Sequence, residues 1–231
     1  MRLSFAEVEL ALRGVHRIRP EKAVAFRARL KHLQREGWPL GTNTGTGTRA
    51  NYTLNSLMQM AMALELLQSG ITPKRAVAAL KSDWSDLVVT LALSQLSAYA
   101  ATNWADSPMR ESEELFWIVR PEALQDLTTA SAEPRPGNLE IMVQRSSQVM
   151  PDLLSFEAGN YREFGALWRS LVIRLSLVTQ AVAAELCDIC ATLEPDTLLK
   201  SFCEELVELP LSKEDLRLVR SLHRYLGGSD S

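Results

Sequence analysis

The amino-acid sequence predicts a mainly α-helical protein with a small β content. Apolar residues recur with the 3.6-residue period of an α-helix over several long stretches. Short stretches rich in β-branched and aromatic residues, typical of strands, interrupt this pattern after residue 114. Charge is also unevenly distributed along the chain. We therefore expect two domains, a helical one over residues 1–83 and an acidic α+β one over residues 84–231.

Two helices are expected in the first forty residues. The first covers residues 4–13, because Ser4 and Glu7 have the spacing of a capping box and Gly14 ends the pattern. The second covers residues 20–36, with Pro20 suited to a first helical turn and Gly37 after its end. Its apolar residues lie on one face at helical spacing: Ala23, Phe26, Leu30 and Leu33.

Residues 39–52 break the helical period with three glycines and four threonines, which favours a β-hairpin. A leucine-rich helix follows until Gly70. Thr72 as cap and Pro73 as first helical residue then predict another helix through about Leu80.

The acidic part is predicted to combine helices with a small sheet. Residues 86–101 are nearly uncharged and indicate a buried or linker helix. Strands are expected at 115–120, 139–145 and 171–175, with a loop at 130–138. Helices are expected at 177–193, 196–208 and 212–226, the last capped by Ser212.

The charge distribution points to a nucleic-acid partner for the first part of the chain. The formal net charge of the 231 residues is −3, but residues 1–90 carry 13 basic and 7 acidic side chains, and the remainder carries 12 and 21. Neutralising phosphates needs positive charge only on the contacting face. The sequence contains no apolar run of eighteen residues and no secretory signal pattern, so we expect a cytoplasmic, nucleoid-associated protein with no membrane contact.

The second helix carries a basic stripe opposite its apolar face. Arg27, Lys31 and Arg35 follow one another at i+4 steps, flanked by His32 and Gln34. Such a helix suits the major groove, although a merely solvated basic face gives the same pattern. Including the hairpin and neighbouring cations, the predicted DNA-binding residues are Lys22, Arg27, Lys31, His32, Gln34, Arg35, Thr44, Thr46, Thr48, Arg49, Tyr52, Lys74 and Arg75.

Residues 3–82 resemble the winged helix-turn-helix DNA-binding domain of the MerR family. The resemblance is carried by Leu30-Lys31-His32-Leu33 followed by Gly37-Trp38, by Arg49 and Tyr52 in the wing, by the leucine-rich helix from Leu57 to Leu67, and by the Gly70-Ile71-Thr72 turn. It implies a DNA-binding fold with the second helix as recognition helix and residues 39–52 as wing. It also implies a bacterial or phage transcriptional regulator. The promoter-untwisting mechanism and the effectors of the MerR family are not inferred for this chain. No long coiled-coil helix is expected after this domain.

Two other functions remain open from the sequence. Related winged modules occur in phage excisionases and terminase small subunits, so a DNA-architecture role fits the same residues. A protein–protein adaptor would instead use its acidic domain to recruit a partner. Contact with RNA polymerase is undecided by the residues.

Catalytic and metal sites are not expected. The three histidines, His16, His32 and His223, accompany no nucleophile or metal motif, so we expect neither an enzyme nor a cofactor. Cys187, Cys190 and Cys203 offer three thiols for a soft metal, but packing is the simpler interpretation because no histidine lies nearby in sequence.

We expect a homodimer formed through the acidic domain. Short strands leave unpaired edges that a second copy can complete, and two-fold pairing would match an inverted-repeat operator. The alternative is a monomer whose sheet edges are covered within the chain.

Overall fold

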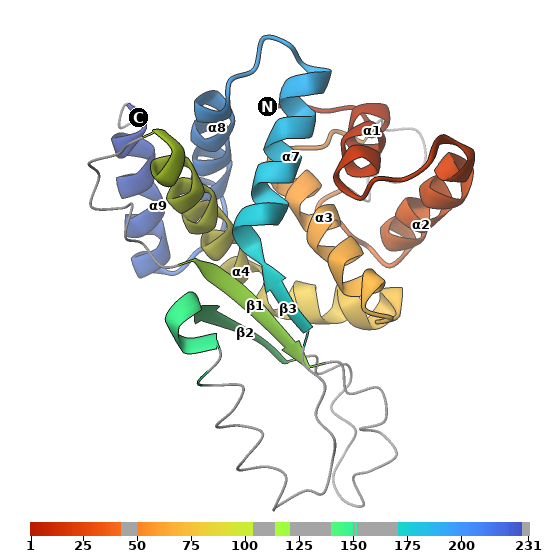
Figure 1. Cartoon of the computed structure of the whole chain (residues 1–231), viewed down its shortest axis with the longest axis horizontal. Helices are drawn as coiled ribbons and strands as arrows, with labels where there is room; N and C mark the ends of the chain where they lie inside the picture. Colours follow the sequence, from red (N-terminus) through yellow and green to blue (C-terminus); the bar gives the residue numbers. More distant parts are fainter. Residues whose placement is uncertain (43–49, 104–113, 121–139, 150, 152–170, 228–231) are drawn as a thin grey trace, which may run out of the picture.

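The computed structural model of the chain describes residues 1–42, 50–103, 114–120, 140–149, 151 and 171–227. It is mainly helical, with a three-stranded antiparallel sheet beneath the helices as drawn in Figure 1. This confirms the expected fold class of mainly α with a small β content.

Helix α1 (Phe5–Val15) begins at the predicted capping box. The Glu7 backbone N–H donates to Ser4 Oγ at 3.3 Å, and the Ser4 backbone N–H donates to Glu7 Oε2 at 2.6 Å. The hydrogen bond from the Ser4 backbone N–H to the carboxylate, followed by the Ser4 side chain, lowers the pKa of Glu7, because it favours the charged form. The helix ends at Val15, slightly beyond the predicted end.

Helix α2 (Ala23–Arg35) follows a short 3-10 turn, η1 (Pro20–Lys22). Pro20 therefore opens a 3-10 turn rather than the α-helix itself, while the end before Gly37 is as predicted. Gly37 has a φ of 77°, a left-handed conformation that favours glycine.

Most of the predicted hairpin lies outside the described residues, namely 43–49. Where the chain is described again, Tyr52 forms an isolated antiparallel bridge with Leu3, with N–H···O distances of 2.8 and 3.1 Å. The hairpin itself stays a prediction. The residue at the end of the predicted segment, Tyr52, is hydrogen-bonded to the start of the chain at Leu3.

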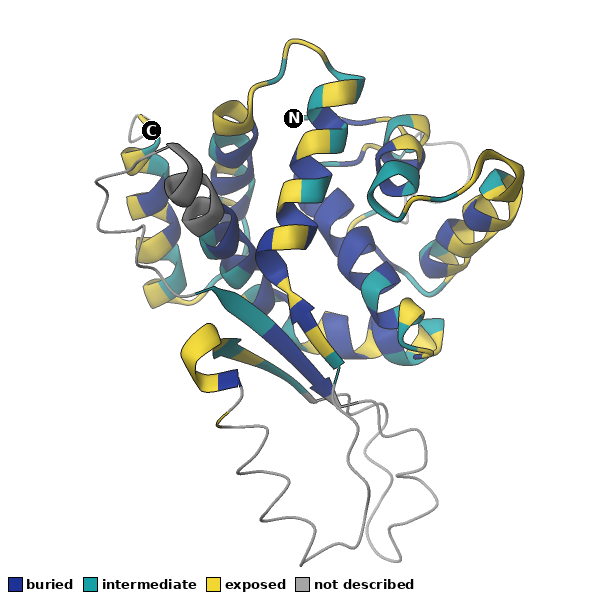
Figure 2. Cartoon of the chain, viewed as in Figure 1, coloured by how far each residue is buried: buried dark blue, intermediate teal, exposed yellow. Residues whose placement is uncertain are grey.

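Helix α3 (Leu54–Gln68) is buried almost all the way round (Figure 2). It packs against α1, α4 (Pro73–Asn103), α7 (Leu175–Ile189) and α8 (Pro195–Val207). Because α3 is covered on nearly all sides, it lacks the polar face that a helix at the protein surface has.

Helix α4 runs without interruption through 31 residues. The sequence predicted one helix ending near Leu80 and another at 86–101, and the separation between them was wrong. Residues 81–85 contain no glycine or proline, and Trp84 is buried among the neighbouring helices. This helix crosses the expected domain boundary at 83/84.

The sheet consists of β1 (Leu115–Arg120), β2 (Glu140–Arg145) and β3 (Leu171–Arg174), in the order β2-β1-β3. All three predicted strands are confirmed within one residue at each end. Trp117 in the central strand is opposite Val143 in β2 and Ile173 in β3, and its indole N–H donates to Thr90 Oγ1 of α4 at 3.2 Å. This bond links the sheet to α4.

Helices α7, α8 and α9 (Lys213–Tyr225) complete the described chain. The predicted cap of α9 is present, since Ser212 Oγ accepts from the Asp215 backbone N–H at 3.1 Å. Helix α7 lies beside α1 and α4 and brings the later part of the chain against the first (Figure 1). Buried side chains from residues 3–92 and 117–222 form one hydrophobic cluster. The division into two domains at 83/84 stays a prediction.

Within the described residues, no helix has both the length and the apolar character to span a bilayer.

Candidate nucleic-acid interface

Helix α2 has one packed side and one basic side that faces solvent. Phe26, Leu30 and Leu33 are buried on the packed side, at angles around the helix where the period of 3.6 residues places them together. On the opposite side Val24 is 81% exposed, and the residues around it are exposed as well. Much of the α2 ribbon accordingly has the colour of exposed residues in Figure 2. The residues on this outer face are Val24, Arg27, Ala28, Lys31 and Arg35.

Arg27 joins the outer face to α1. Its Nε donates to Glu9 Oε2 at 2.7 Å, and the Glu9 carboxylate is buried while the Arg27 side chain remains 55% exposed. The hydrogen bond and the negative charge of Glu9 raise the pKa of Arg27. Arg27 therefore orients α2 against α1. The exposed part of its side chain remains accessible to a ligand.

Gln34 and Tyr52, both predicted DNA contacts, bind each other. Gln34 Nε2 donates to the Tyr52 hydroxyl, and Tyr52 is only 2% exposed. Burial raises the pKa of this phenol. Tyr52 is thus a core residue rather than an exposed contact, because its ring packs beside Phe5 and its backbone pairs with Leu3.

The remaining predicted contacts in the described chain are spread over three elements. His32 is exposed on α2, and its Nε2 lies 3.4 Å from Glu36 Oε1. Lys22 is exposed in η1, on the side of α2 that faces α3. Lys74 and Arg75 are in the first turn of α4, where Lys74 is exposed and Arg75 is partly buried. Thr44, Thr46, Thr48 and Arg49 lie outside the described residues.

The chain after α2 is fixed to α3 where the predicted wing begins. Trp38 is fully buried, its indole N–H donates to the Gln59 carbonyl oxygen at 2.7 Å, and its ring meets Trp84 edge-on at 5.5 Å. The Leu40 backbone N–H donates to Gln59 Oε1 at 2.6 Å. Gln59 therefore holds the start of residues 39–52 beside the end of α2.

Sequence reasoning missed three residues in this region. Glu9 has the charge that orients Arg27, and Arg29 is an exposed cation on the α3-facing side of α2. His16 lies under the same side of α2, between α1 and α3. Arg29 was not predicted because the helical period of α2 places it outside the basic stripe. Glu9 was not predicted because nothing in the neighbouring sequence indicates that its carboxylate is buried.

The cysteines are described as free thiols. Cys203 is buried in α8, and burial together with the charge of Glu204 raises its pKa to about 12. Burial, followed by nearby carboxylates, raises the pKa of Cys187. Metal binding requires thiolates, which these environments disfavour. Among the described residues, no group of three or more histidine, cysteine or carboxylate side chains is arranged to hold a metal ion.

Comparisons with protein-family models, curated proteins and solved structures give no match for this chain.

Proposed function

We propose that the chain is a sequence-specific double-stranded-DNA-binding protein, a MerR-like transcriptional regulator. In this proposal residues 3–82 form the winged helix-turn-helix, with α2 as recognition helix and residues 39–52 as wing. The observation that carries it is the outer face of α2, where three cations surround exposed apolar side chains.

The chemistry of this face fits a major groove. Lysine and arginine can donate to guanine O6 and N7 or to phosphates, while small apolar side chains such as Val24 and Ala28 can contact thymine methyl groups. The net charge of −3 gives the chain no general attraction to DNA, so binding must depend on such a local basic surface.

Removing two cations from this face tests the proposal. Lys31→Ala/Arg35→Ala should weaken binding of the full-length protein to duplex DNA by about tenfold or more at low salt, because each lost phosphate contact reduces the slope of log affinity against log salt by about one unit. Fluorescence anisotropy over a salt series measures both quantities.

The matched control is Arg217→Ala/Arg220→Ala, which removes the same charge from exposed positions of α9. This control should bind DNA like the unmodified protein. A Lys31→Ala/Arg35→Ala variant with an unchanged circular-dichroism spectrum and unchanged affinity would show that α2 is not the interface. Failure of the unmodified protein to bind duplex DNA at low salt would favour the adaptor function.

We propose further that the regulator is a homodimer, with the sheet contributing to the interface. Strands β2 and β3 are the outer strands of the described sheet. They carry two partly exposed valines, Val143 at 36% and Val172 at 40%. Outer strands with exposed apolar side chains are suited to pairing with another chain.

Sedimentation of the full chain at micromolar concentration should give twice the monomer mass of 25.7 kDa. Placing a charge on β3 with Val172→Lys should shift this equilibrium toward monomer, because a lysine must be desolvated when the strand is covered. A monomer in both proteins removes the dimer from the proposal. An undisturbed dimer in the variant places the interface away from β3.

A further inference from the structure

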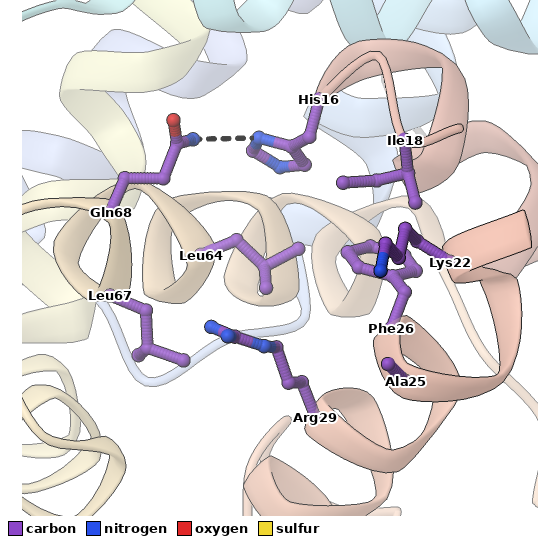
Figure 3. Close-up of a pocket in the computed structure, with 9 residues that line it drawn as sticks. All are labelled: His16, Ile18, Lys22, Ala25, Phe26, Arg29, Leu64, Leu67 and Gln68. Atoms are coloured by element: carbon purple, nitrogen blue, oxygen red, sulfur yellow. Dashed lines mark hydrogen bonds between the residues drawn. The ribbon is translucent and has the colours of Figure 1, made fainter.

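A pocket of about 320 Å³ lies between the end of α1, η1, α2 and α3. Figure 3 shows its side chains arranged around a common space, with α2 on one side and α3 on the other. Its apolar wall consists of Ile18, Ala25, Phe26, Leu64 and Leu67. The polar residues around this wall are His16, Lys22, Arg29 and Gln68.

His16 has a buried nitrogen without a hydrogen-bond partner. Its side chain is only 5% exposed. Gln68 Nε2 lies 2.9 Å and Glu65 Oε1 lies 3.3 Å from Nδ1, whereas Nε2 has no hydrogen-bond partner among the described residues. In Figure 3 this nitrogen lies on the pocket side of the ring, facing the apolar side chains. A buried ring nitrogen without a hydrogen-bond partner costs free energy, which marks this side of the pocket as suited to a polar group of a ligand.

The imidazole is neutral in this environment. Burial lowers the pKa of His16 to about 4, so at neutral pH the ring contributes a hydrogen bond and no charge. The positive charges come instead from Lys22 and Arg29 at the mouth of the pocket. Neither cation has an ion-pair partner within the described part of the chain, so the mouth favours an anion.

We propose that this pocket binds a small organic acid with an apolar body and one carboxylate. The body lies against Phe26, Leu64 and Leu67, and the carboxylate lies at the mouth beside Lys22 and Arg29. The inference does not rest on the proposed DNA binding, because every contact is made within the pocket.

Sodium benzoate is a suitable probe, with benzyl alcohol as a neutral analogue of the same ring. Two-dimensional NMR of the isotope-labelled full-length protein, without DNA, should show saturable shifts from benzoate in residues 16–29 and 64–68. Benzyl alcohol should bind about tenfold more weakly, because it cannot form the charge-assisted hydrogen bonds. A control titration with sodium chloride at the same concentrations shows which shifts come from ionic strength rather than from benzoate binding.

Two substitutions locate the site. Arg29→Gln should raise the benzoate Kd about tenfold, and Ala25→Leu should abolish saturable binding because it occupies the pocket. Their controls are Arg217→Gln on α9 and Ala78→Leu on α4, both at exposed positions outside the pocket. No saturable benzoate shift, equal binding of benzyl alcohol, or an unaltered Kd in both pocket variants would overturn the proposal.

Discussion

Replacing Glu205 with alanine should lower the free energy of unfolding by about 2–3 kcal/mol. Glu205, on α8, accepts hydrogen bonds from the first two backbone N–H groups of α3: Leu54 N lies 3.1 Å from Oε1 and Asn55 N lies 2.7 Å from Oε2. Thr53 Oγ1 accepts from the third, Ser56 N, at 3.2 Å. Without Glu205, two buried donors at the positive end of a helix lose their partner.

Glu208→Ala is the matched control, because Glu208 is exposed at the end of the same helix. Urea denaturation of the full-length variants at neutral pH compares them directly. Glu205→Gln should fall between alanine and the native residue, since an amide keeps one accepting oxygen. Equal stability of the Glu205→Ala and Glu208→Ala variants would contradict the capping role.

Acidification should destabilise the protein through His16 by about 3 kcal/mol between pH 6.5 and 4. The folded-state pKa is depressed from 6.5 to about 4, so in this range the unfolded chain binds a proton that the folded chain does not. The contribution of His16 is therefore fully present above pH 6.5 and is lost as the pH falls through the folded-state value.

Neighbouring charges modify this pH dependence. Glu65 Oε1 lies 3.3 Å from His16 Nδ1, and burial raises the Glu65 pKa, which contributes stability at low pH that is lost as the pH rises. Glu65 thus opposes His16, and the cations Lys22 and Arg29 line the same pocket as the ring. Urea denaturation at several pH values in this range measures how the free energy of unfolding depends on pH. The slope against pH should be smaller in His16→Gln and larger in Glu65→Gln than in the unmodified protein. An unchanged slope in His16→Gln would show that His16 is not responsible.

Local signals predicted most of the secondary structure. The capping box of Ser4 and Glu7, the glycine at position 37 and the cap at Ser212 each act within a few residues, so the sequence alone locates the helix ends. Trp117 and its neighbours are β-branched or aromatic along a short run, which locates β1. The separation of α4 into two helices failed because a change in composition after Trp84 is not a helix-breaking signal.

The candidate site was predictable only where helical periodicity determines it. The period places Lys31 and Arg35 opposite the packed face of α2, where both are exposed. Tyr52 was misplaced because its burial depends on Leu3 and Gln34, which are far from it in sequence. The histidine of the pocket was missed for the same reason, since its partners are on α3.

The burial of α3 has a consequence for the protein during its synthesis. Two of the helices that cover α3 follow it late in the chain, and α8 begins 127 residues after α3 ends. At ribosomal rates of about 5–20 residues per second, roughly 6–25 s pass between the synthesis of α3 and that of α8, the last helix that covers its apolar surface. During that interval its leucines and methionines are available to other chains, so a nascent-chain chaperone is the expected temporary partner of this helix.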